Sequence, residues 1–169
     1  MTRVGILSDT HAWWDDRYAF YFASCDEIWH AGDIGNDLVA DRLAAIAPLR
    51  AVHGNIDGQS LRRRFPATLT FELEGLRVAM LHIAGRPGRY EAAARALLTS
   101  YRPNILVAGH SHILKIAHDP AFNCLFINPG AAGRQGWQTV STLVRLTLDA
   151  GRPLDCEVIE LAKPTSPAR

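Results

Sequence analysis

Seven side chains that can bind metal ions follow closely after short apolar runs of the sequence. Two pairs are each separated by a single residue, Asp9 with His11 and His110 with His112. The other three members of the set are Asp33, Asn55 and His82. Because side chains two residues apart on an extended backbone point the same way, we expect each pair to present both side chains to one place.

This mixture of imidazole, carboxylate and amide groups contains no thiolate. It suits manganese, iron, zinc, nickel or cobalt better than calcium or a thiolate-bound structural zinc. Seven ligands are too many for one tetrahedral ion, but they fit two divalent ions that keep open positions and share one bridging carboxylate. The residue types therefore predict a two-metal centre, and manganese is the ion we expect.

Alternating strands and helices should carry the first of these residues. The pattern predicts strands over residues 3–8, 27–30 and 49–53 and helices over residues 17–24 and 37–46. This alternation indicates βαβ units and a largely parallel sheet, in which ligand sites lie beyond the carboxyl ends of the strands. Gly32, Gly54 and Gly109 each precede one of the seven residues and let the chain turn sharply there.

The second half of the chain predicts a different arrangement. Residues 68–73 and 77–82 flank Glu74-Gly75 and indicate a hairpin, followed by a helix at 91–100 and a strand at 105–108. Strands at 113–117, 124–127, 140–148 and 154–161 follow without helices between them, which indicates an antiparallel meander. We expect one domain over residues 1–162 with two packed sheets, and a frayed Pro/Ser-rich tail at 163–169.

Five short motifs occur in the order in which they occur in a known family. They are Asp9-Thr10-His11, Gly32-Asp33, Gly54-Asn55-Ile56-Asp57, His82 and Gly109-His110-Ser111-His112. The set resembles the calcineurin-like metallophosphoesterases, and the resemblance covers residues 4–130. The chain length and Asn128-Pro129-Gly130 are similar to the small bacterial and archaeal phosphodiesterase branch. Each motif alone would be a weak signal, but the ordered set is specific.

The resemblance implies an α/β fold: a four-layer αββα sandwich of two mixed sheets flanked by helices. It also implies a division of the ligands, with Asp9, His11 and His112 on one metal. Asn55, His82 and His110 would then hold the second metal, and Asp33 would bridge the two. The activity implied is hydrolysis of a phosphate ester by in-line attack of a hydroxide that bridges the ions, with Asp33, Asn55 and His110 as the catalytic residues.

One departure from the family pattern restricts the expected substrate. Protein-phosphatase relatives place a histidine directly after Gly-Asn, where it can protonate the leaving group, and this chain has Ile56. Without that acid, diesters and activated esters are favoured over monoesters. A second departure is Ile83-Ala84 after His82, where the family has a glycine. The alternatives are a phosphomonoesterase for a small metabolite and a non-catalytic protein-binding scaffold on the same fold, as in a eukaryotic retromer subunit that resembles this family.

The composition argues against some classes of partner but does not indicate a function. The 169 residues carry 18 Lys and Arg against 17 Asp and Glu, so the formal charge of +1 indicates neither a nucleic-acid surface nor a membrane partner. The three cysteines are far apart and odd in number, and no signal peptide is recognisable, so we expect a cytoplasmic protein. The expected partner is a small phosphate ester, and a homo-oligomer is left open.

Several other residues near the motifs have two interpretations. Trp13 and Trp14 either line the substrate mouth or pack the first helix onto the sheet. Arg86, Arg89 and Arg134 lie in loops that reach the rim, but for each one alone a solvated arginine is the favoured interpretation. The remaining residues are interpreted as structural or solvated: His30, His53 and Asp57 as buried or capping residues, His118 and residues 62–64 as solvated.

Overall fold

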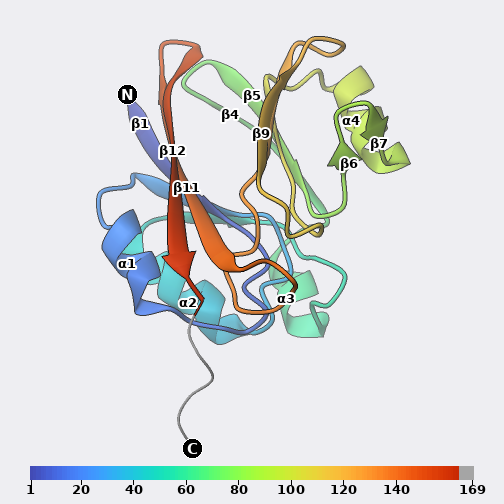
Figure 1. Cartoon of the computed structure of the whole chain (residues 1–169). Helices are drawn as coiled ribbons and strands as arrows, with labels where there is room; N and C mark the ends of the chain where they lie inside the picture. Colours follow the sequence, from blue (N-terminus) through green and yellow to red (C-terminus); the bar gives the residue numbers. More distant parts are fainter. Residues whose placement is uncertain (164–169) are drawn as a thin grey trace, which may run out of the picture.

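Two five-stranded sheets lie face to face in the computed structural model, which describes residues 1–163 (Figure 1). The first sheet has the order β12-β11-β1-β2-β3. Its strands are β1 (Thr2–Leu7), β2 (Glu27–His30), β3 (Leu49–Ala51), β11 (Val140–Asp149) and β12 (Arg152–Ala162). β1, β2 and β3 are parallel, while β11 is antiparallel to both β1 and β12.

The second sheet has the order β4-β5-β8-β10-β9. Its strands are β4 (Thr68–Leu73), β5 (Leu76–Leu81), β8 (Ile105–Val107), β9 (Lys115–Asp119) and β10 (Cys124–Asn128). β5, β8 and β10 are parallel, and β4 and β9 pair antiparallel at the two edges. A small separate hairpin joins β6 (Gly85–Arg86) to β7 (Arg89–Tyr90).

Helices cover the outer faces of both sheets. α1 (Asp16–Phe22), α2 (Asp37–Ile46) and the short α3 (Gln59–Arg64) pack on the first sheet, and α4 (Ala92–Ser100) packs on the second (Figure 1). Asp15 and Asn36 cap the amino ends of α1 and α2 through their side-chain oxygens. The four-layer αββα arrangement is therefore confirmed.

Alternation along the central strands produces the three apolar layers between these elements. In β1, Val4 and Ile6 face the other sheet, whereas Leu7 faces α1 and α2. In β5, Met80 joins the layer between the sheets and Leu81 packs against α4. Strands buried on both faces read as continuous apolar runs, which is why β1 and β8 were recognisable in the sequence.

The predicted antiparallel meander of the last four strands is wrong. β9 and β10 extend the second sheet, while β11 and β12 belong to the first, so residues 129–139 cross from one sheet to the other. β11 buries both faces, with Leu143 toward the helices and Val144 toward the other sheet, and it therefore needs a central position between β1 and β12.

α3 and the β6–β7 hairpin had not been predicted, because each is too short to show a periodic pattern. The three cysteines are free thiols. Within residues 1–163, no helix has the length and apolar character needed to cross a membrane. Apart from Lys163, the tail predicted for residues 163–169 lies outside the described residues, and the single domain over 1–162 stays a prediction.

Candidate metal centre

All seven candidate ligands follow the carboxyl ends of parallel strands. Asp9 and His11 follow β1, Asp33 follows β2 and Asn55 follows β3 of the first sheet. The remaining three come from the second sheet, His82 after β5 and His110 and His112 after β8. Both sheets therefore contribute to one rim, as the position of ligand sites in such sheets requires.

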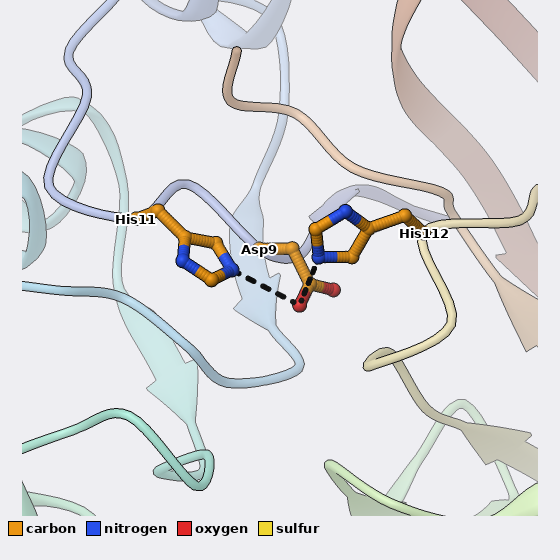
Figure 2. Close-up of side chains that lie close together, drawn as sticks. All are labelled: Asp9, His11 and His112. Atoms are coloured by element: carbon orange, nitrogen blue, oxygen red, sulfur yellow. Dashed lines mark ion pairs between the residues drawn. The ribbon is translucent and has the colours of Figure 1, made fainter. Parts of the chain in front are cut away.

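The first group of converging side chains consists of Asp9, His11 and His112 (Figure 2). Oδ1 of Asp9 lies 3.7 Å from Nε2 of His11 and 3.3 Å from Nε2 of His112. Figure 2 shows both imidazoles aimed at the same carboxylate oxygen from opposite sides. Three ligand atoms this close, with carboxylate and imidazole mixed, have the composition of a divalent-cation site.

The second group consists of Asp33, His82 and His110. Nε2 of His82 lies 3.2 Å from Oδ2 of Asp33. Asn55 extends this group, because its Oδ1 lies 3.1 Å from Nδ1 of His110. These two groups contain all seven residues predicted from the sequence.

Asp33 joins the two groups. Its Oδ2 lies 3.5 Å from Nε2 of His11 in the first group as well as 3.2 Å from Nε2 of His82 in the second. This carboxylate thus faces imidazoles of both groups, which is the position a bridging ligand would need. Oδ1 of Asp9 also reaches the second group, but at a longer distance, 3.7 Å from Nε2 of His82.

The two carboxylates each keep one oxygen for the site. Oδ2 of Asp9 accepts hydrogen bonds from the Ser8 hydroxyl and the His110 backbone N–H, at 2.7 and 3.1 Å. Oδ1 of Asp33 accepts one from the backbone N–H of Ile56. The other oxygen of each carboxylate is left to face the histidines. Such supporting bonds orient metal ligands.

Three buried atoms at this point have no hydrogen-bond partner in the described part of the chain: Oδ1 of Asp9 and Nε2 of both His11 and His82. Buried polar atoms normally have partners, so a cluster of orphans calls for an ion or water. His82 is held in a suitable form, because its Nδ1 donates to the Ala31 carbonyl at 2.8 Å and leaves Nε2 with a lone pair. The residues present therefore fit divalent cations.

The pKa shifts of the site residues also indicate a cation site. Burial alone would raise the pKa of Asp9, but the imidazoles of His11 and His112 outweigh it and hold that pKa far below its usual value. The pKa of Asp33 is also lowered, because His82 outweighs burial. In return, Asp9 raises the pKa of His112. Two ionised carboxylates in a largely buried site create a negative field that favours cations.

The backbone of the site is unusual. Five of the ten non-glycine residues with positive φ in the described part of the chain are site residues, with φ of 55° at Asp9, 46° at His11, 56° at Asp33, 73° at His110 and 62° at His112. Such conformations are costly for these residues and concentrate at functional sites.

This backbone corrects one expectation. We expected each pair of residues two apart to point to one place. Asp9 and His11 do belong to one group, but for His110 and His112 the expectation was wrong, because they belong to different groups. None of the four residues is extended, since all four have left-handed backbone beyond the ends of β1 and β8, so the rule applies to neither pair.

Buried polar residues beneath the ligands tie their loops together. His30 is fully buried; its Nδ1 accepts from the Gly32 N–H, its Nε2 lies 3.0 Å from the Thr10 hydroxyl, and that hydroxyl donates to the Ile34 carbonyl. This network links the loop of Asp9 to the loop of Asp33. His30 thus has the structural role expected of it.

Asp57 and Arg62 support the loop of Asn55. The Asp57 carboxylate accepts backbone N–H groups of Ile34, Gly35 and Gly54. Arg62 donates to the carbonyls of Asp57, Gly54 and Asn55, although residues 62–64 had been interpreted as a solvated face. Hydrogen bonds to main-chain carbonyls leave no sequence signal, so this role of Arg62 was missed.

The aromatic residues after the first motif have separate surroundings. Trp14 packs against the apolar layer under α1 and makes an edge contact with Tyr18. Trp13 is covered by Arg134, whose guanidinium carbon lies 4.3 Å from the centre of the indole ring. Packing is therefore the outcome for Trp14, whereas Trp13 and Arg134 form a cation–aromatic pair beside His11.

Comparison with known proteins agrees with this geometry. The family model described as a calcineurin-like phosphoesterase superfamily domain matches residues 2–151. The chain belongs to the calcineurin-like phosphoesterase superfamily. The match spans all seven site residues, the second sheet and the first sheet except β12.

Two curated members of the superfamily from archaea are similar in sequence. A "Probable metallophosphoesterase" from Methanothermobacter thermautotrophicus is 28% identical over 170 residues, covering 95% of this chain and 94% of the relative. A second protein of that description, from Methanocaldococcus jannaschii, is 30% identical over 139 residues, covering 76% of this chain and 67% of the relative. Both relatives therefore carry the metallophosphoesterase name.

Solved structures show the same fold at lower identity. Vps29 from Chaetomium thermophilum has a TM-score of 0.74 with 15% identity, covering 97% of this chain and all of that chain. A predicted phosphoesterase from Streptococcus pneumoniae has a TM-score of 0.70 with 18% identity, covering 96% and 93%. Vps29 from Entamoeba histolytica complexed with Zn²⁺ has a TM-score of 0.71 with 17% identity, covering 94% and 98%.

Proposed function

We propose that this calcineurin-like phosphoesterase is a phosphodiesterase that uses two divalent metal ions, with manganese as the expected ion. Asp9, His11 and His112 would hold one ion and Asn55, His82 and His110 the other, with Asp33 between them. The observation that carries the proposal is the position of Asp33 Oδ2, which faces His11 of one group and His82 of the other.

When bound, two ions would supply a nucleophile from water at neutral pH and would neutralise charge on the phosphate. The protein residues supply the rest. The Ser8 hydroxyl and the His110 N–H fix the Asp9 carboxylate, and the Ile56 N–H fixes Asp33. The amide of Asn55 beside the His110 imidazole, both exposed, places two polar groups where a phosphate oxygen would lie.

The preference for diesters rests on Ile56. Its side chain is 47% exposed at the rim, directly after Asn55, where protein-phosphatase relatives have a histidine. A site without an acid at this position favours substrates whose leaving group needs no proton.

A scaffold that binds protein partners is the competing function, and the fold likeness to Vps29 favours it. Four apolar side chains at the site are also exposed, namely Ile56, Ile83, Ile113 and Trp137. The enzyme is preferred because all seven positions keep groups that can bind a metal, and three of their atoms are buried without partners.

The test is hydrolysis of bis(p-nitrophenyl) phosphate and p-nitrophenyl phosphate by chelator-treated protein, before and after manganese is added. We expect manganese-dependent turnover, with the larger kcat/KM on the diester. The Asp33→Asn variant should lose its bound metal, and its activity should fall by at least about 100-fold. The control Asp155→Asn, at an exposed position in β12, should match the wild type in both. Turnover that persists under chelation, or a preference for the monoester, would overturn the proposal.

A further inference from the structure

A basic cavity of about 370 Å³ adjoins the candidate metal centre. It lies between the β6–β7 hairpin, which follows His82 in the chain, and the segment that carries His110 and His112. Ser111 and Ile113 of that segment form part of its wall. The same segment therefore contributes to the metal centre and to the wall of this cavity.

Three cationic side chains, Arg86, Arg89 and Lys115, line the cavity. Among the described residues that line it there is no Asp or Glu. Within residues 1–163, none of these three cations lies within ion-pair distance of a carboxylate. The protein as a whole is nearly neutral, with a formal charge of +1. Three unpaired cations around one cavity therefore create a local positive potential that attracts an anion.

Four other arginines of the protein are paired. Arg17, Arg50, Arg64 and Arg145 each pair with a carboxylate at 2.6–2.9 Å.

The walls of the cavity are fixed by hydrogen bonds. The Tyr90 hydroxyl donates to Asp119 at 2.6 Å and ties β7 to β9, the strand that begins with Lys115. The Asn128 amide donates to the Gly109 carbonyl and to the Ser111 hydroxyl, at 3.0 and 3.1 Å. The hairpin and the histidine segment are therefore both anchored, and the cations are held beside the metal centre.

We propose that this cavity binds a second anionic group of the substrate, so that the protein prefers phosphodiesters that carry an additional phosphate on one ester group. The inference rests on the proposed function and adds the substrate class. Arginine pairs bind phosphate through charge-assisted and often bidentate hydrogen bonds. Ile113 and Phe126 complete the lining with apolar surface, which suits the carbon skeleton of a sugar or nucleoside between two phosphates.

Two chromogenic diesters that differ only in the second phosphate test the inference. They are the p-nitrophenyl ester of thymidine 5′-monophosphate and the same ester with a 3′-phosphate. With manganese-loaded protein, we expect kcat/KM to be at least about tenfold larger for the 3′-phosphorylated ester. In the Arg86→Gln/Arg89→Gln variant this ratio should fall to within about twofold of one. Arg95→Gln, at an exposed position in α4 outside the cavity, should keep the wild-type ratio.

A wild-type ratio near one, or a ratio that the double variant leaves unchanged, would overturn the inference. Turnover of both esters without preference would leave the proposed function intact. If no diester is turned over, the proposed function fails, and calorimetry then decides the inference. We expect thymidine 3′,5′-bisphosphate to bind manganese-loaded protein at least about tenfold more tightly than thymidine 5′-monophosphate, and equal dissociation constants would refute the cavity as an anion site.

Discussion

Gly54 packs so closely against Asp33 that a Cβ at position 54 would overlap Oδ1 of the Asp33 carboxylate. The same carboxylate turns its other oxygen toward His11 and His82. The glycine of the Gly-Asn motif is therefore a requirement of the carboxylate that joins the two groups.

Gly54→Ala should displace Asp33 and lower metal affinity and activity by about 10–100-fold, the range typical when the support of a metal ligand is removed. Gly58→Ala is the matched control, because a Cβ at Gly58 meets nothing within 4 Å and its φ is −81°. Manganese titration of both variants measures the effect. Equal affinities in the two variants would show that the contact with Asp33 is without consequence.

Arg62→Ala should weaken manganese binding about tenfold, because Arg62 holds three carbonyls of the loop that carries Asn55. Arg63→Ala, at the next and exposed position of α3, should bind manganese as the wild type does. Calorimetric titration of the two variants makes the comparison. If Arg63→Ala were weakened as much as Arg62→Ala, the loss would reflect the charge of the run and not these hydrogen bonds.

Ile56→His should raise kcat/KM for phenyl phosphate relative to p-nitrophenyl phosphate by at least about tenfold, since the poorer leaving group gains from a placed general acid, which contributes roughly 10²–10⁴ to rate. Ile56→Gln brings polarity of similar size without an acid and should leave the ratio near the wild-type value. Steady-state kinetics with both substrates give the ratios. An Ile56→His protein with an unchanged ratio would show that Ile56 does not set the preference.

His30 should make stability depend on pH. Burial lowers its pKa to about 4 from the ordinary 6.5, so the folded protein holds this proton less tightly than the unfolded chain. The contribution to stability is complete above pH 6.5 and is lost as the pH falls toward 4. On that basis the wild type should lose on the order of 2 kcal/mol between pH 7 and pH 5 through His30.

Urea unfolding in the presence of a chelator measures this effect. His30→Asn should lose less stability than the wild type between pH 7 and pH 5, because the titrating group is gone. His118→Asn replaces an exposed histidine and should follow the wild type. Parallel losses in all three proteins would contradict the assignment to His30.

Much of this architecture could be predicted from sequence, for local reasons. β1, β5 and β8 were recognisable because burial on both faces makes them continuous apolar runs, and the polar residues that follow them mark the strand ends. The convergence of the seven residues followed from the rule that such strand ends share a rim.

The predictions that were wrong or missing concern backbone conformation and contacts between distant parts of the chain. The spacing of His110 and His112 wrongly predicted one shared position, because their backbone is left-handed and not extended, whereas the family resemblance had implied that they divide between two groups. The crossing between β10 and β11 depends on which sheet has room for a strand buried on both faces. Arg62 acts through backbone carbonyls, which every residue has.

Anomalous diffraction from crystals grown with manganese tests the central claim most directly. The account predicts two peaks, on the order of 3.5–4 Å apart. One should lie among Asp9, His11 and His112, and the other beside His82 and His110, with the Asp33 carboxylate between them. Crystals at saturating manganese that show no peak at these residues would contradict it.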